Sequence, residues 1–289
     1  MEKMIARAAD ALKMGEVVIF PTETVYGLGA SVSIPRAVKR IYELKGRPSD
    51  NPIIIHVSDM KQAESLIQEP PESFFRLAER FWPGPLTLVV KKQDWVTDAV
   101  SGGLATIAIR MPAHPIAKQL IDLAGPLAAP SANHSGKPSP TSLHDALEDL
   151  GEKVPVALDG GPCSIGIEST VVSLLQEEPI LLRPGHITRI QIEEELQRPT
   201  ALPPAHGPIL SPGMKYRHYA PKAPVRLVFD INHVKGPTVI RTPRAETIYA
   251  ELRRHDREGA LQIEIFCDAK VRSDPALMDR LLRASSSIG

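Results

Sequence analysis

The chain has 289 residues, with 34 lysines plus arginines and 34 aspartates plus glutamates, so its formal net charge is zero. This balance excludes a polycation that coats nucleic acid, although a local basic patch remains compatible with it. Apolar residues make up 43% of the chain and charged residues 24%, which is ordinary for a globular protein with a core and argues against disorder along the whole chain.

The two cysteines, Cys163 and Cys267, stand far apart in the chain. They offer neither a zinc site nor a disulfide framework, and they favour a reducing, cytoplasmic compartment. Charged residues interrupt the N-terminal segment, so we expect no signal peptide. No run approaches the roughly 20 apolar residues of a membrane helix, so we expect no membrane contact.

Proline and aromatic contents depart from the average. There are 28 prolines, near twice the usual share of about 5%, whereas aromatic residues make up only 4% of the chain. Prolines fix loops, and binding sites are commonly built on fixed loops. A protein that grips bases by stacking usually carries more aromatic side chains.

In chain order, helical and strand patterns alternate through residues 1–198. Apolar spacing with Pro and Gly punctuation predicts helices over residues 4–14, 35–44, 59–81 with a break at Pro70-Pro71, 114–123 and 188–197. Apolar runs predict strands over residues 17–20, 52–57, 86–90, 105–110, 127–129, 154–158, 170–175 and 180–182. Several connections are too short for helical crossovers, so we predict an α/β fold with a mixed parallel and antiparallel sheet.

A proline-rich stretch divides this region from the rest. Seven prolines within residues 199–224 predict a semi-rigid linker, yet its middle carries two tyrosines, a histidine and two cations. Beyond it, strands over 225–229, 238–241 and 261–266 and helices near 245–254 and at 275–284 predict a small α/β domain. The predicted organisation is a domain at 1–198, a linker at 199–224 and a domain at 225–289.

Three polar segments follow predicted elements, where ligands of α/β sheets commonly bind. The first is FPTETVYGLG at 20–29. The second, KGRPSDN at 45–51, holds two cations in a loop stiffened by Pro48 and could clamp phosphate or carboxylate. The third, AAPSANHSGKPSPT at 128–141, is rich in hydroxyls and suits anions. Alone, each also fits a plainer interpretation: a capped turn, cations at a helix C-terminus, or a surface loop.

Other features of the sequence narrow the chemistry. Arg110, Ser169 and Arg183 lie at the beginning or end of predicted strands. The sequence has no glycine-rich dinucleotide fingerprint, P-loop or serine nucleophile elbow, and its nine histidines lack metal-ligand spacing. A site rich in cations and hydroxyls and poor in nucleophiles suits phosphoryl or nucleotidyl transfer.

Seven ordered blocks resemble the threonylcarbamoyl-AMP synthase family, the YrdC-domain proteins: FPTETVYGLGA, KGRPSDNPIIIHV, FWPGPLT, IAIRMP, APSANHSGKPSPT, IESTVV and LRPG. SPGMKYRHYAP resembles the linker of that family's long, two-domain form, so the resemblance covers about residues 1–222. It implies a twisted mixed sheet flanked by helices around a concave basic cavity. It also implies a second domain larger than the one predicted here.

The resemblance implies a nucleotidyltransferase that condenses L-threonine, bicarbonate or CO2 and ATP, with Mg²⁺, into threonylcarbamoyl-AMP and pyrophosphate. Beyond these small-molecule substrates, it implies hand-off to a threonylcarbamoyl-transferase complex that modifies tRNA next to the anticodon, and a weak tRNA contact. The family's KxR…SxN signature falls on the catalytic positions Lys45, Arg47, Ser131 and Asn133. No residue is assigned as a metal ligand.

The same matching assigns the substrate contacts. ATP would contact Arg47, Asn51, Thr106, Ser131, Ser139, Arg183 and a linker tyrosine, which is Tyr216 or, by preference, Tyr219. Threonine would contact Thr24, His56, Arg110, Ala129 and Ser169.

Two other functions remain open from the sequence. An RNA-binding module without catalysis would also use basic loops, although the neutral charge and scarce aromatic residues argue against it. The same domain performs carbamoyl-adenylate chemistry inside hydrogenase-maturation proteins, but those resemble larger chains with zinc-finger cysteines that this sequence lacks.

Overall fold

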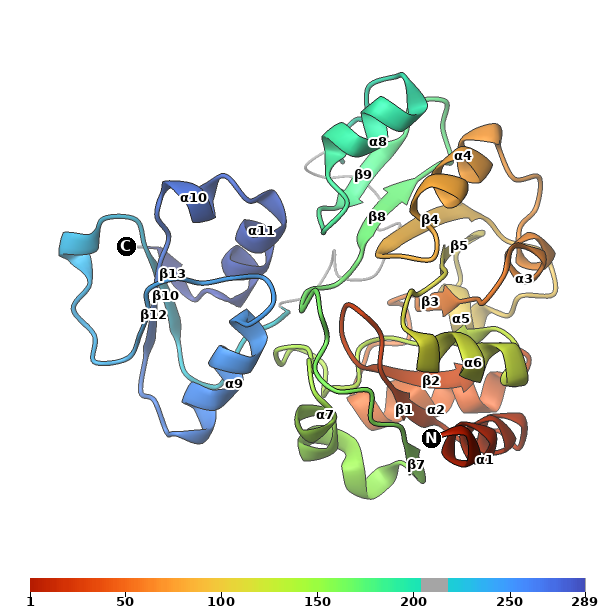
Figure 1. Cartoon of the computed structure of the whole chain (residues 1–289), viewed down its shortest axis with the longest axis horizontal. Helices are drawn as coiled ribbons and strands as arrows, with labels where there is room; N and C mark the ends of the chain where they lie inside the picture. Colours follow the sequence, from red (N-terminus) through yellow and green to blue (C-terminus); the bar gives the residue numbers. More distant parts are fainter. Residues whose placement is uncertain (204–217, 289) are drawn as a thin grey trace.

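The computed structural model describes residues 1–203 and 218–288, which form two domains that each contain a separate sheet (Figure 1). Among these residues, the larger sheet has nine strands in the order β7-β1-β2-β6-β3-β5-β4-β8-β9, with parallel and antiparallel neighbours. The described part of the smaller sheet has four strands in the order β11-β12-β10-β13, and its pairs are parallel. The predicted mixed α/β fold with a small second domain is therefore confirmed.

The elements of the first domain follow the predicted order closely. Its strands are β1 (Val18–Phe20), β2 (Gly27–Ser31), β3 (Ile54–His56), β4 (Leu86–Lys91), β5 (Thr106–Arg110), β6 (Leu127–Ala128), β7 (Val156–Ala157), β8 (Thr170–Ser173) and β9 (Ile180–Arg183). Its helices are α1 (Glu2–Lys13), α2 (Pro35–Lys45), α3 (Met60–Leu66), α4 (Glu72–Phe81), α5 (Asp98–Ser101), α6 (Pro115–Ala124), α7 (Leu143–Leu150) and α8 (Arg189–Leu196), with a 3-10 turn at Gly151–Lys153. None of the described helices is long and apolar enough to cross a membrane.

The second domain contains the strands β10 (Val225–Val228), β11 (Val239–Ile240), β12 (Ile263–Phe266) and β13 (Ser287–Ile288). Its helices are α9 (Ile248–Arg257), α10 (Ala269–Arg272) and α11 (Pro275–Ala284), and a 3-10 turn spans Ile231–His233. In Figure 1, α9 and α11 lie on the side of this domain that faces the first domain. Side chains of these two helices can therefore contact the first domain.

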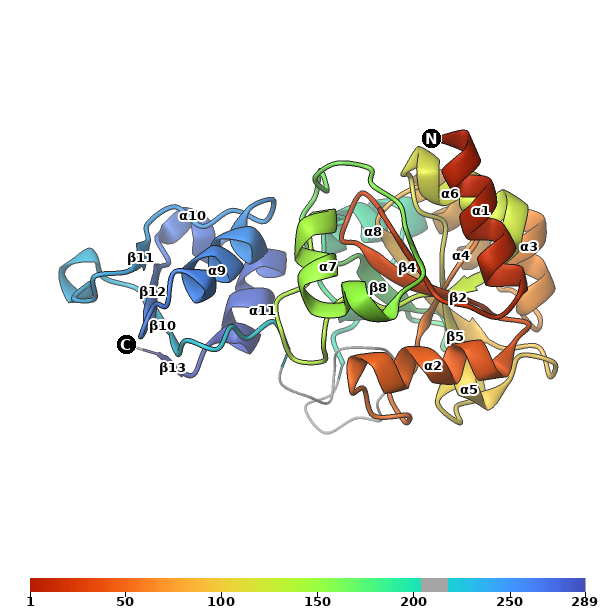
Figure 2. The same ribbon diagram turned by 90° about the horizontal axis from the view of Figure 1, so that it is seen from below.

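The larger sheet separates two apolar cores because successive strand residues point to opposite faces. Ile19 and Ile55 contribute to the core that contains residues of α2, α4 and α8. Val18 and Phe20 contribute to the core that contains residues of α1 and α6. Figure 2 shows α1 and α6 on one side of the sheet and α2 and α5 on the other. A third, smaller cluster consists of strand residues alone: Ile54, Val89, Ala108, Val171 and Leu182.

β2 and α7 are absent from the sequence-based prediction. The sequence of β2, GLGAS, lacks the β-branched and aromatic residues that favour strands. Packing explains its glycines, because a Cβ on Gly29 would lie 2.8 Å from the Phe20 ring. α7 is short and begins directly after a proline-rich loop, where Ser142 caps it by accepting from the Asp145 amide. β2 thus lacks a local strand pattern, whereas α7 does carry apolar residues at helical spacing, namely Leu143, Ala146, Leu147 and Leu150.

The domains are joined by apolar packing and by buried charge. Val25 and Ile167 of the first domain belong to the same apolar core as Val225, Leu252 and Leu281 of the second. Several arginines of the second domain also donate hydrogen bonds to groups of the first. The second domain is therefore an integral part of the packed structure.

Gly166 lies at a close approach between the domains. Its φ is +79°, and a Cβ at this position would lie 2.6 Å from backbone atoms of Ala245 and Glu246. Gly161 provides a matched comparison, because its φ is +76° and nothing lies within 4 Å of an added Cβ. The two glycines share the left-handed backbone, and only one of them contacts the second domain.

We predict that Gly166→Ala destabilises the domain interface, whereas Gly161→Ala costs only the left-handed strain of about 1 kcal/mol. Calorimetric unfolding should show a larger fall in the midpoint for Gly166→Ala. Limited proteolysis should also release the second domain sooner from that variant. Equal effects of the two substitutions would mean that backbone strain alone accounts for the loss.

Candidate active site

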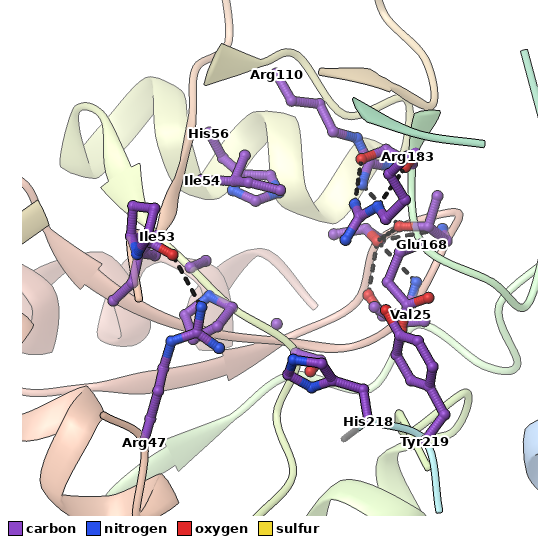
Figure 3. Close-up of a pocket in the computed structure, with 18 residues that line it drawn as sticks. Val25, Arg47, Ile53, Ile54, His56, Arg110, Glu168, Arg183, His218 and Tyr219 are labelled. Carbon is purple, nitrogen blue, oxygen red and sulfur yellow. Dashed lines mark hydrogen bonds between the residues drawn. The ribbon is translucent and has the colours of Figure 1, made fainter. Parts of the chain in front are cut away.

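A pocket lies at strand ends of the larger sheet, with His218 and Tyr219 of the segment before the second domain in its wall (Figure 3). Its walls come from the β1–β2 connection, the ends of β3, β5 and β9, and the loops that follow α2 and β6. The lining residues are Thr22, Thr24, Val25, Gly27, Arg47, Pro52, Ile53, Ile54, His56, Arg110, Ala129, Pro130, Ser131, Glu168, Ser169, Arg183, His218 and Tyr219.

Most of the predicted site residues meet in this pocket. The ones that line it are Thr24, Arg47, His56, Arg110, Ala129, Ser131, Ser169, Arg183 and Tyr219. The ones that do not are Lys45, Asn51, Thr106, Asn133 and Ser139. Tyr216, the other linker tyrosine considered, lies outside the described residues. Segments from seven regions of the sequence thus converge as the motifs indicated.

Lys45 and Ser139 act behind the pocket wall. The Lys45 ammonium donates to the carbonyls of Ser131 at 2.6 Å and of Asn133 at 2.5 Å, which ties the end of α2 to the loop after β6. Burial lowers the pKa of Lys45 well below its usual value, and the nearby Arg47 charge lowers it further. Ser139 Oγ donates to Glu168 Oε1 at 2.5 Å. Both residues fix the positions of groups that line the pocket.

Asn51 and Asn133 hold loops, and Thr106 lies at a strand end. The Asn51 carbonyl accepts from Arg47 Nε at 3.2 Å. Asn133 Nδ2 donates to the carbonyls of His134 and Lys137, which closes the loop on itself. Thr106 begins β5, so it lies at the opposite end of that strand from Arg110. The structure therefore places these residues around the pocket and not in its lining.

Arg47 and Arg183 flank the pocket from two sides (Figure 3). Arg47 Nη2 donates to the Pro52 carbonyl at 2.9 Å, and Arg183 donates to the carbonyl and hydroxyl of Ser169 at 3.0 and 3.1 Å. Burial lowers the pKa of both guanidinium groups, that of Arg47 to about 10. Both stay charged at neutral pH, so the pocket attracts anions.

Arg110 provides a further cation at the end of β5. Its Nη1 donates to Thr24 Oγ1 at 2.7 Å, and its Nε donates to the Gly84 carbonyl at 3.2 Å. Its Nη2 lies 2.6 Å from Glu23 Oε1, which forms an ion pair. That contact lacks hydrogen-bond geometry, and Nη2 has no hydrogen-bond partner among the described residues. Arg110 is thus rigidly held at the pocket, with Glu23 as its buried counter-ion.

The two histidines of the pocket are uncharged at neutral pH. Burial and the Arg110 charge lower the pKa of His56 to about 3. Burial and the Arg47 charge lower the pKa of His218 to about 4. Within the described part of the chain, neither His56 Nδ1 nor His218 Nε2 has a hydrogen-bond partner. Each imidazole therefore has a buried nitrogen available to a polar ligand.

Glu168 and His218 are lining residues that the sequence analysis does not assign. Glu168 accepts hydrogen bonds from Ser139, from Tyr249 at 2.9 Å and from Arg280 at 2.8 Å. Burial alone would raise the pKa of Glu168, but the Arg280 and Arg183 charges outweigh it and lower the pKa to about 2. In the sequence, Glu168 is recognisable as an isolated acidic residue just before a predicted strand. Its partner Arg280, however, lies 112 residues away.

Comparison with known proteins agrees with this architecture. The family described as "Telomere recombination" matches residues 10–185, and the family described as "Threonylcarbamoyl-AMP synthase, C-terminal domain" matches residues 187–241. The chain belongs to the threonylcarbamoyl-AMP synthase family. Within this family, the synthase of Pyrococcus abyssi is 52% identical over 232 residues, which cover 78% of this chain and 68% of that protein. The Bacillus subtilis synthase is 51% identical, covering 78% and 67%.

Solved structures of the family share the whole fold. The crystal structure of Pyrococcus abyssi Sua5 complexed with L-threonine aligns with a TM-score of 0.91 and 41% identity, covering all of this chain and 96% of that one. A variant of the same protein, with an adjacent histidine and tyrosine replaced by alanine, aligns with a TM-score of 0.92. This chain and Pyrococcus abyssi Sua5 thus share their overall fold across both domains.

We predict that His56 makes the protein less stable as the pH falls. Folded His56 titrates near pH 3, whereas an unfolded histidine titrates near about 6.5, so below that pH the unfolded state binds more protons. For each histidine of this kind, the free energy of unfolding should then fall by about 1.4 kcal/mol for every unit by which the pH is lowered. His56→Gln should flatten this dependence between pH 6.5 and 4 in urea unfolding experiments.

The exposed His144 provides the control, because its side chain is 75% exposed. His144→Gln should keep the wild-type pH dependence. If His56→Gln kept it as well, His56 would have to be protonated in the folded protein.

Proposed function

We infer that the chain is an L-threonylcarbamoyladenylate synthase. It joins L-threonine, bicarbonate or CO2 and ATP into threonylcarbamoyl-AMP and releases pyrophosphate, for the threonylcarbamoyladenosine modification of tRNA. The observation that carries this inference is one pocket that combines an amino-acid recognition side, around Arg110 and His56, with cations suited to a triphosphate, Arg47 and Arg183. The names of relatives more than 50% identical support it.

For threonine, we propose that Arg110 binds the carboxylate while Thr24, His56 and Ser169 recognise the hydroxyl and the amine. The neutral imidazole of His56 can accept a hydrogen bond from either group. Ala129, whose small side chain also lines the pocket, would leave room for the ligand. The threonine complex of the Pyrococcus abyssi protein supports this part of the proposal.

For the chemical steps, the threonine amine first forms a bond to the carbon of CO2 and loses a proton, which gives a carbamate. If bicarbonate reacts directly, a C–O bond breaks as the C–N bond forms and water leaves. A carbamate oxygen then attacks the α-phosphorus of ATP, and the bond to pyrophosphate breaks. Negative charge grows on the phosphoryl oxygens and on pyrophosphate. Arg47 and Arg183 are positioned to stabilise that charge with Ser131, and no protein nucleophile is needed.

In this proposal, four of the remaining predicted residues position others, and two contact the nucleotide. Lys45 and Asn133 fold the loop that presents Ser131, as their hydrogen bonds indicate. Asn51 orients Arg47, and Ser139 orients Glu168. Thr106 stays a proposed ATP contact. Tyr219, together with His218, would cover the nucleotide, and both line the pocket.

Mg²⁺ enters this proposal with ATP. Among the described lining residues Glu168 is the one carboxylate, and it already accepts from Ser139, Tyr249 and Arg280. It therefore does not fit as a metal ligand. Mg²⁺ readily keeps its waters and binds phosphate oxygens. We derive no step from a magnesium ion held by protein side chains.

The product is a mixed anhydride that water destroys, so another enzyme must consume it promptly. We propose that it passes to a threonylcarbamoyl-transferase complex that modifies tRNA, with a weak tRNA contact during transfer. Because tRNA and ATP are used in the cytoplasm, we place the reaction there. An RNA-binding module without catalysis gains no support from the named relatives.

The reaction gives a direct test. Wild-type protein incubated with ATP, bicarbonate and threonine should release pyrophosphate in a threonine-dependent way. Valine should be at least about 100-fold poorer in kcat/KM, because it lacks the hydroxyl and leaves buried polar groups unpaired. Equal release with valine would refute the proposed threonine contacts, and no amino-acid-dependent release would refute the synthase assignment.

We predict that Arg47→Ala lowers kcat/KM for ATP by about 100-fold or more, since it removes one charged donor from the developing phosphoryl charge. Arg40 provides a control on α2, the helix that precedes Arg47, because it forms an exposed ion pair with Glu43 at 3.1 Å. Arg40→Ala should keep wild-type kinetics. Near-normal activity of Arg47→Ala would exclude Arg47 from the phosphate site.

A further inference from the structure

Arg280 of α11 reaches from the second domain into the wall of the pocket. Its side chain is completely buried. Its Nε donates to Glu168 Oε2 at 2.8 Å, and its Nη2 donates to the Glu168 carbonyl at 3.1 Å. Its Nη1 donates to the carbonyl of Pro184 at 2.9 Å, directly after Arg183. One guanidinium group of the second domain therefore contacts two segments that line the pocket.

The same guanidinium group also contacts Tyr219. Its central carbon lies 5.6 Å from the centroid of the Tyr219 ring. On α9, Tyr249 stacks against Tyr219 with the ring centroids 5.4 Å apart and the planes at 29°. The Tyr249 hydroxyl donates to the Glu168 carboxylate at 2.9 Å. Two side chains of the second domain thus hold both Tyr219 and Glu168.

The charge of Glu168 explains why this contact matters for the pocket. Glu168 lines the same cavity as Arg47 and Arg183, where ATP phosphates are proposed to bind. An unpaired carboxylate there would repel phosphate and would compete for Arg183. Arg280 pairs with Glu168 at 2.8 Å and also with Asp279 at 2.8 Å, outside the pocket lining. Because Glu168 has this partner, more of the positive charge of Arg47 and Arg183 remains available to an anion.

We propose that Arg280 is a positioning residue for the nucleotide: it neutralises Glu168 and fixes Tyr219, so the second domain completes the ATP side of the pocket. The proposal rests on the synthase function inferred above. Arg280 itself does not line the pocket, so it acts through Glu168 and Tyr219. Threonine recognition lies mainly on β3, β5 and the β1–β2 connection, so it should depend much less on Arg280.

Four variants separate charge from packing. Arg280→Met keeps an unbranched apolar side chain but removes the charge, and Arg280→Lys restores a charge without the guanidinium fork. Glu168→Gln in the Arg280→Met background removes the unpaired carboxylate. Arg257→Met is the matched control, since Arg257 makes interdomain ion pairs with Asp145 and Glu148, away from the pocket.

Calorimetry should measure the binding of a non-hydrolysable ATP analogue and, separately, of threonine. We expect Arg280→Met to weaken the analogue at least tenfold and threonine less than threefold. The double variant should recover most of the nucleotide affinity, Arg280→Lys should lie between, and Arg257→Met should match the wild type. Wild-type nucleotide binding by Arg280→Met would overturn the proposal, and so would equal weakening of both ligands without recovery in the double variant.

Hydrogen exchange gives a measurement that does not depend on catalysis or on ligand. The Ala220 amide, next to Tyr219, donates to the Gly136 carbonyl at 2.8 Å. Its exchange should be at least tenfold faster in Arg280→Met than in the wild type or in Arg257→Met. Unchanged exchange would show that Arg280 does not position Tyr219. If the wild type released no pyrophosphate, the synthase assignment would fail while this measurement still tested Arg280.

Discussion

The carboxylate of Glu168 is almost fully buried at the junction of the two domains, so water solvates it poorly. An ionised group in that environment requires several donors, and the chain supplies them from the loop after β6, from α9 and from α11. Removing one donor from such a network is more damaging than replacing the whole network with apolar groups. The positions of both domains and of Tyr219 therefore depend on this one group being satisfied.

The charge states of the other pocket residues depend on the same balance between burial and charge. Burial keeps His56 and His218 neutral, so they provide hydrogen bonds without adding to the positive charge. The guanidinium groups of Arg47 and Arg183 remain charged because arginine resists deprotonation even when buried. The result is a site in which fixed cations lie beside neutral polar groups, which suits the phosphates and the amino acid that we propose to bind there.

Sequence patterns predict much of this arrangement but not all of it. Apolar runs such as that of β4 and proline-led helices such as α2 are local signals, and the structure confirms them. β2 depends on glycines that fit against Phe20, a contact that no local pattern reveals. Motif matching brings Arg47, Arg110 and Arg183 to one pocket, yet it cannot tell a lining residue from a supporting one such as Lys45. The role of Glu168 depends on Arg280, a pairing between distant segments that a single sequence does not encode visibly.

The shared apolar core has a consequence for the order of events during synthesis on the ribosome. The nine-stranded sheet draws on residues up to Arg183, so the first domain can begin to fold while the second is still being made. At that stage Val25 and Ile167 lack their packing partners, and Glu168 lacks its guanidinium. The nascent chain would therefore expose an apolar patch beside a bare carboxylate until α11 emerges. Nucleotide-binding competence should arise late in translation, which would keep unfinished chains from consuming ATP.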